Sequence, residues 1–233
     1  MAAKVMGKAL AHDSARLHVS GAAAYTDDLP EPRGLLHMAV GMSSKAHANI
    51  TNLDLGAVIA APGVVDVFVA SDIPGDNNCG PIIHDEQIFN PEVVEYAGQA
   101  IFAVAAETVD QARKAARMAA IEYEELEGIL DPLDAVEKES FVLPTETLLR
   151  GDAAAALAAA PHRLQRRLDL GGPDQFNNEG GSAGAVPGVE GAIAVCSWAR
   201  LPDEVRLRVA GARGRGAGGG GGGCRRGGGG VGG

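Results

Sequence analysis

Residues 100–125 read AIFAVAAETVDQARKAARMAAIEYEE and decide the fold class of the front part of the chain. Residues 100–105 form an apolar run of strand length, and Thr108 with Gln111 has the spacing of a helix capping box. Apolar side chains then repeat at helical spacing, at Val109, Ala112, Ala116 and Ala119. Residues 121–125 alternate between apolar and acidic side chains, as a half-exposed strand does. The stretch therefore predicts a strand, a capped helix and a second strand.

The preceding sequence predicts a similar unit. Residues 35–42 (LLHMAVGM) and 64–70 (VVDVFVA) have the length and composition of buried strands. Between them, Asp54 is placed to cap a short helix through Ala60, which a Pro-Gly pair ends. Together the two units predict a compact domain of class α/β (α+β) over residues 15–127, with mixed strands and two helices on one side.

A second domain is predicted over residues 128–210. Asp131 precedes a proline, which is favoured at the first position of a helix, and Asp152 caps a further helix through an alanine-rich run. Residues 163–170 (RLQRRLDL) and 192–197 (AIAVCS) have strand character and are separated by the turn-rich sequence GGPDQFNNEGG.

The C-terminal end differs sharply in composition from the rest. Residues 211–233 hold 15 of the 33 glycines, and arginine supplies all of their charge. Such a segment cannot bury enough apolar area to offset its chain entropy, so it is predicted to be disordered.

Charge and hydropathy exclude several classes of protein. Of 20 basic and 30 acidic residues, the first 205 residues hold 14 and 30, a net charge of −16, which disfavours general contact with nucleic acid or an anionic membrane. No run approaches the roughly 18 to 20 apolar residues of a membrane span, and the N-terminus does not resemble a signal peptide. We therefore expect a cytoplasmic protein without membrane contact.

The cysteines and acidic clusters give no strong site. Cys79, Cys196 and Cys224 lie far apart, outside any metal-binding spacing, and an iron-sulfur cluster would need about four such ligands. We expect free thiols. The adjacent residues 84–86 (HDE) fit a solvated loop better than a metal site, because neighbours on an extended loop point in different directions.

Three glutamates also raise the question of paired carboxylates for acid/base chemistry. Glu122, Glu124 and Glu125 lie on the half-exposed strand, where they share the segment with Tyr123 and Leu126. A solvent-facing strand edge explains them better.

Several segments, in order and in register, resemble one family. These segments are residues 18–50 (HVSGAAAYTDDLPEPRGLLHMAVGMSSKAHANI), 75–87 (GDNNCGPIIHDEQ), 96–99 (YAGQ), 140–150 (SFVLPTETLLR) and the following Gly-Asp pair. Together they are similar to the opening of the molybdenum-binding subunit in the xanthine dehydrogenase and aldehyde oxidase family.

The resemblance implies an α/β hammerhead domain over residues 15–127, followed by the truncated start of a molybdenum cofactor-binding domain. It implies a parent enzyme that hydroxylates purines such as hypoxanthine or xanthine with water at a molybdenum-molybdopterin cofactor. Electrons would then pass to iron-sulfur clusters and FAD on partner subunits. The family's catalytic glutamate and substrate-binding arginine belong beyond Gly233, so no catalytic residue is assigned to this chain.

Only Gly229, Gly230 and Gly232 carry over from the family's cofactor contacts, because a glycine loop lets backbone N–H groups approach the cofactor closely. Val231 stands where the family has a phenylalanine, and Arg200 where it has a glutamine near the metal. The segment GGPDQFNNEG likewise departs from the family's pattern. We therefore expect the isolated chain to be inactive and to bind no cofactor.

Three hypotheses follow. The chain is a fragment of the molybdenum-binding subunit, or a non-catalytic module that docks the FAD/iron-sulfur subunit, or a nucleic-acid binder through its Arg/Gly tail. The few arginines of the tail have no aromatic partners, which disfavours the third hypothesis.

Overall fold

A computed structural model describes residues 7–11, 14–172, 181–188, 192–197, 201–214 and 224–226. The chain divides into two compact units, Met1–Leu126 with Phe176–Gly233, and Glu127–Gln175. Each is described separately.

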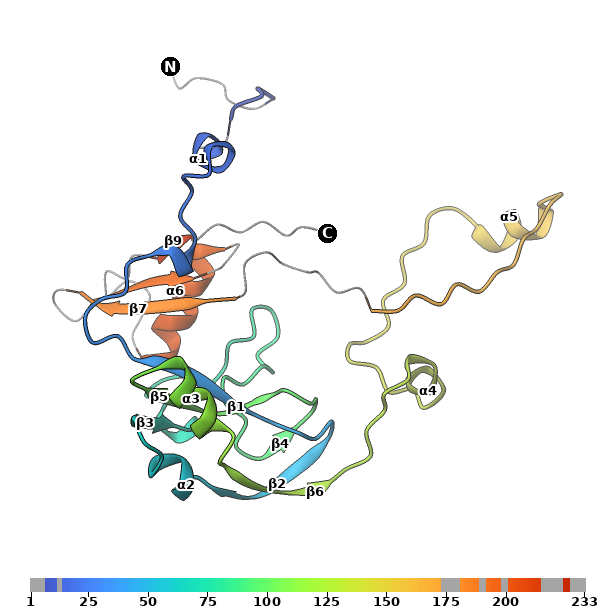
Figure 1. Cartoon of the computed structure of the whole chain (residues 1–233). Helices are drawn as coiled ribbons and strands as arrows, with labels where there is room; N and C mark the ends of the chain where they lie inside the picture. The colour runs from blue at the N-terminus through green and yellow to red at the C-terminus, as the bar shows by residue number, and fades with distance from the viewer. Residues whose placement is uncertain are drawn as a thin grey trace. The chain divides into compact units, whose positions relative to one another are not determined.

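The first part of unit 1 contains two short helices before its first strand and a helix between its last two strands (Figure 1). Its elements are α1 (Ala15–Ser20), η1 (Thr26–Asp28), β1 (His37–Met42), β2 (Ala48–Asp54), α2 (Gly56–Ile59), β3 (Val64–Phe68), η2 (Ala70–Asp72), β4 (Val93–Val94), β5 (Ala100–Ala106), α3 (Val109–Ala116) and β6 (Ala120–Glu125).

These strands form two three-stranded sheets, in the orders β1-β5-β3 and β4-β2-β6. Their pairings are antiparallel, which replaces the mixed arrangement predicted from the sequence. Strand β5 is central, and its residues 101–106 are all buried. An unbroken apolar run suits a strand that is covered on both faces.

The core lies between the sheets and α3, which contacts β1 and β5. Its fully buried side chains belong to Ala48, Val58, Val94, Ile101, Phe102, Val104 and Ala115. The N–H of Gln111 donates to Oγ1 of Thr108 at 3.2 Å, so the predicted cap is present. The predicted strand, capped helix and strand over residues 100–125 are confirmed as β5, α3 and β6.

The earlier strands differ from prediction in burial. Strands β1 and β3 are present, but they are the edges of their sheet rather than buried. Met38 and Val40 are 62% and 45% exposed, and Val65 is 56% exposed. Apolar composition alone does not distinguish an edge strand from a central one, because that depends on the pairing partners.

The short helix predicted after Asp54 is present as α2, and Asp54 caps it through its side chain, although the N-cap position itself is Leu55. Asp54 ends strand β2, which the sequence did not predict, and its carboxylate accepts the N–H of Gly56 at 2.8 Å. The helix itself is shorter than predicted and has Leu55 at its N-cap. Pairing with β6 forms β2, and this nonlocal contact leaves little signal in a segment with two asparagines, ANITNLD.

Unit 2 contains α4 (Pro132–Glu137) and α5 (Ala153–Ala159). Both predicted caps are confirmed: Asp131 accepts the N–H of Leu133 at 2.7 Å, and Asp152 that of Ala155 at 2.9 Å. The strand predicted at residues 163–170 is not formed. The segment has no strand partner among the described residues, so its strand propensity alone does not make a strand.

The second part of unit 1 contains β7 (Ala183–Pro187), β8 (Ile193–Ser197), α6 (Pro202–Ala212) and β9 (Cys224–Arg226). They form a sheet in the order β7-β8-β9, in which β8 and β9 are parallel. The strand predicted at residues 192–197 is confirmed as β8, whereas β7 and α6 were not predicted.

The disorder predicted for the C-terminal segment stays a prediction, and the structure describes only residues 211–214 and 224–226 of it. Helix α6 extends to Ala212, and residues 224–226 form β9. Backbone hydrogen bonds hold β9 to β8, and these need no apolar side chain. The remaining residues of the segment lie outside the described part of the chain.

Candidate functional site

The candidate cofactor site begins where β8 and β9 end. The two strands are parallel, and their last residues, Ser197 and Arg226, are partners in the register. Carboxyl ends of neighbouring parallel strands meet at one edge of a sheet, where open α/β sheets bind ligands. Strands β8 and β9 therefore end at the same edge of the sheet.

The segments singled out from the sequence follow this edge. Arg200 comes three residues after β8, and Gly229 three residues after β9. Arg200, Gly229, Gly230 and Gly232 themselves lie outside the described residues.

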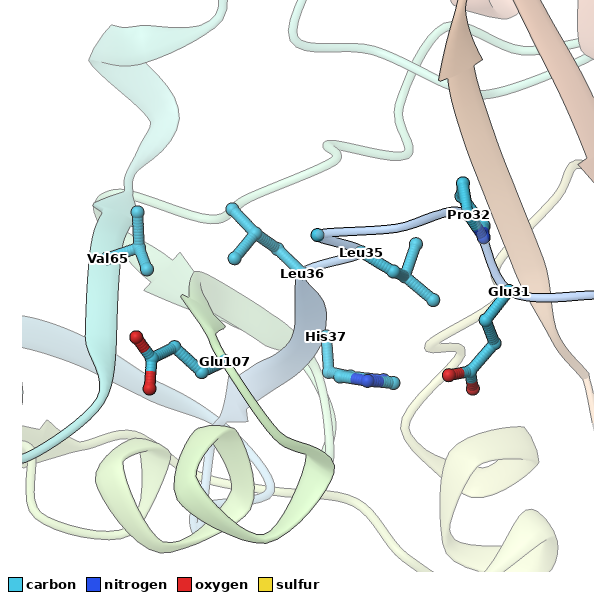
Figure 2. Close-up of a pocket in the computed structure, with 8 residues that line it drawn as sticks. Glu31, Pro32, Leu35, Leu36, His37, Val65 and Glu107 are labelled. Atoms are coloured by element: carbon cyan, nitrogen blue, oxygen red, sulfur yellow. The ribbon is translucent and has the colours of Figure 1, made fainter.

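A second candidate is an open pocket of about 450 Å³ beside β1 (Figure 2). It is lined by Glu31, Pro32, Gly34, Leu35, Leu36, His37, Val65 and Glu107. In this view the imidazole of His37 lies between the side chains of Glu31 and Glu107. This pocket could not be predicted from the sequence, because its residues come from three separate segments.

The pocket does not have the features of a catalytic site. Both glutamates are exposed and His37 is only half-buried. Among the described residues, no group of three or more His, Cys, Asp or Glu side chains is arranged to hold a metal ion. We assign it no reaction.

The acidic candidates lie on the surface. His84, Asp85 and Glu86 are all exposed, as a solvated loop requires. Glu124 accepts a hydrogen bond from Nδ2 of Asn49 at 3.0 Å. Glu122 and Glu125 are also exposed, and Glu125 forms an ion pair with Lys45. The prediction of a solvent-facing strand edge is confirmed.

Cys79 lies in a loop after β3. Its N–H donates to the carbonyl oxygen of Glu86 at 2.8 Å. Desolvation of the thiol raises the pKa of Cys79, and the nearby Glu86 carboxylate raises it further, against the opposing charge of Arg208. Cys79 and Cys196 are free thiols, as predicted. A raised thiol pKa disfavours a nucleophilic role.

Within the described ranges, the helices are too short or too polar to cross a bilayer.

Comparison with known proteins identifies the family. Residues 20–127 match the aldehyde oxidase and xanthine dehydrogenase, a/b hammerhead domain. The xanthine dehydrogenase of Dictyostelium discoideum is 36% identical over 222 residues, which are 95% of this chain and 16% of that protein. The chain belongs to the aldehyde oxidase and xanthine dehydrogenase family.

Further similar proteins support this family assignment. The xanthine dehydrogenase of Oryza sativa subsp. japonica is 35% identical over 98% of this chain and 17% of its own length. The chain thus spans about a sixth of the length of these relatives. Quinoline 2-oxidoreductase from Pseudomonas putida 86 shares the fold, with a TM-score of 0.70 at 23% identity over 89% of this chain and 28% of that one.

The sequence resemblance implies a neutral amide donor at the position of Arg200 and an aromatic side chain at that of Val231, and both residues lie outside the described part of the chain. Of the motif GGPDQFNNEG, Gly171 and Gly172 are exposed, and residues 173–180 lie outside the described part of the chain. We therefore derive no chemical step through this cofactor.

Proposed function

We propose that this chain supplies the hammerhead domain and the opening of the cofactor domain of a molybdenum-binding subunit of xanthine dehydrogenase type. The whole enzyme would act in the cytoplasm on a small purine, with FAD and iron-sulfur clusters on a partner subunit. The observation that carries the proposal is the 36% identity that extends over 95% of the chain.

The chain alone is proposed to be inactive. Its contribution is a scaffold, namely the buried strand β5 with α3 over it, and a sheet edge to which β8 and β9 lead. The substitutions at Arg200 and Val231 remove the side chains that the family uses beside its cofactor. A cofactor site needs its contacting groups held by a supporting shell.

The proposal can be tested with chimeras of a related xanthine dehydrogenase. In one, residues 20–127 of this chain replace the corresponding segment of the relative. In the second, the replacement extends through Gly233 and the relative's sequence resumes after it. We expect the first chimera to keep its molybdenum content and xanthine-dependent dye reduction, and the second to lose both.

Reverting two residues in the second chimera provides the matched control. Arg200→Gln with Val231→Phe should recover part of the molybdenum content. Loss of folding in the first chimera would contradict the proposed scaffold role, and full activity of the second would contradict the proposed effect of Arg200 and Val231.

One observation favours a docking role as a second candidate. Unit 2 exposes large apolar side chains, among them Leu130 (83%), Val142 (98%) and Leu148 (98%). Large exposed apolar side chains of this kind are candidate contacts for a partner. We propose the FAD/iron-sulfur subunit of a relative as the partner.

Capture of that subunit by the immobilised chain tests this candidate. Val142→Glu with Leu148→Glu should abolish capture without changing the melting temperature, because neither side chain is buried. Glu146→Gln, an exposed change in the same segment, serves as the control. Equal capture by both variants would contradict the docking role.

A further inference from the structure

The loop signature GDNNCG at residues 75–80 has no chemical role so far, yet every one of its residues makes a defined contact. Asn77 closes the neck of the loop: its Nδ2 donates to the carbonyl oxygen of Phe89 at 2.8 Å, and the N–H of Phe89 donates to Asn77 Oδ1 at 3.0 Å. The N–H of Gly80 donates to Asn78 Oδ1 at 2.9 Å. These bonds make residues 74–89 a rigid, hairpin-like element.

The base of this hairpin meets the C-terminal end of α6. The N–H of Gly75 donates to the carbonyl oxygen of Ala212 at 2.9 Å, and the N–H of Asp76 donates to that of Gly211 at 3.0 Å. The last carbonyls of a helix have no partner within the helix. The hairpin supplies two of those partners from a distant part of the sequence.

The approach is too close for any side chain at Gly75. A Cβ there would lie 2.0 Å from the carbonyl oxygen of Gly211 and 2.3 Å from the backbone nitrogen of Gly214. Both neighbours are backbone atoms, which cannot move aside as a flexible side chain can. Glycine is required here by the space available.

A charge on α6 reaches the same hairpin. The guanidinium of Arg208 acts on the thiol of Cys79 and lowers its pKa, against the larger effect of desolvation. This effect agrees with the contact that the hydrogen bonds at Gly211 and Ala212 establish.

We propose that the hairpin of residues 74–89 is the docking element of the hammerhead domain for the C-terminal end of α6, and that Gly75 determines this docking by lacking a Cβ. The hammerhead domain thereby holds the helix that packs on β9. This inference is independent of the proposed enzymatic role, since it concerns contacts within unit 1 alone.

Hydrogen exchange of the Gly75 and Asp76 amides in the full chain tests the docking. In the wild type both should be protected, although they lie in a loop. Val209→Pro breaks α6 far along the sequence from the hairpin, and it should make both amides exchange about tenfold faster or more, as expected for two lost hydrogen bonds. Gly75→Ala should have the same effect.

The amides of β5 report whether the hammerhead domain is still folded, and they should be unchanged in both variants. Gly184→Ala is the matched control, because a Cβ at that position on β7 meets nothing within 4 Å. Unprotected Gly75 and Asp76 amides in the wild type, or exchange in Val209→Pro equal to the wild type, would overturn the proposal. Should Gly75→Ala unfold the domain, Val209→Pro still decides the question.

Discussion

Gly41 and Phe102 face each other across β1 and β5, and the ring of Phe102 fills the space above the glycine. A Cβ at Gly41 would lie 2.0 Å from Cε1 of Phe102. Phe102 is fully buried. Because Gly41 on β1 has no side chain, there is room for Phe102 on β5, the largest fully buried side chain of the core.

Gly41→Ala should lower the free energy of unfolding by about 1 to 3 kcal/mol, because the added methyl group overpacks the core. Combining it with Phe102→Leu should cost less than the sum of the two single changes, since the smaller side chain leaves room for the methyl group. Urea denaturation of the four proteins measures this coupling. Strictly additive losses would show that the two residues do not share the space.

Val67→Asp should unfold the hammerhead domain, whereas Val65→Asp should change its stability by less than about 0.5 kcal/mol. Val67 packs against the core, but Val65 is 56% exposed on the same strand. Burying an unpaired carboxylate costs several kcal/mol of a total stability of about 5 to 15. Circular dichroism melts compare the two variants, and similar melting temperatures would contradict the difference in burial between Val65 and Val67.

Thr108→Ala should destabilise the domain by about 1 kcal/mol by removing the cap of α3. Thr108→Ser keeps a hydroxyl that can accept the N–H of Gln111 and should retain most of the stability. Thermal denaturation of both variants provides the measurement. The same loss in both would mean that the methyl group of Thr108, not its hydroxyl, is what matters.

Alkylation of Cys79 should follow a pH profile with a midpoint above the value of about 8.5 of an unperturbed thiol. Desolvation and Glu86 raise the pKa of Cys79, so less thiolate is present at a given pH. Arg208→Met should move the midpoint higher, because it removes a charge that lowers this pKa. Iodoacetamide rates in a Cys196→Ser, Cys224→Ser background test both points; a midpoint below 8.5 or a downward shift would contradict them.

A helix or strand could be predicted from the sequence where the signals for it lie within its own residues. The apolar run of β5 and the cap at Thr108 are complete in the sequence, and both are present in the structure. Strand β2 was missed because pairing with β6 forms it, and its own segment has little apolar periodicity. Helix α6 begins with Pro202, Asp203 and Glu204, an N-terminal signal, but its apolar side chains show little helical periodicity.

Strand β9 and the loop at Gly75 show a second limit of prediction from the sequence. Strand β9 pairs with β8 through backbone hydrogen bonds, which amino-acid composition does not predict. Likewise, Gly75 carries no side-chain chemistry, and its close approach to Gly211 depends on a fold that joins distant segments. The resemblance to the family singled out the loop that contains Gly75. Only the three-dimensional arrangement explains why glycine is required at this position.

The central claim is that this chain has the family's scaffold without a functional cofactor site. Molybdenum content measured by elemental analysis, after co-expression with the machinery that makes and inserts the cofactor, tests this most directly. The positive charge of Arg200 and the loss of the aromatic ring at Val231 predict molybdenum at background level and no xanthine-dependent dye reduction. About one molybdenum atom per folded chain, as expected for an intact site, would contradict the account.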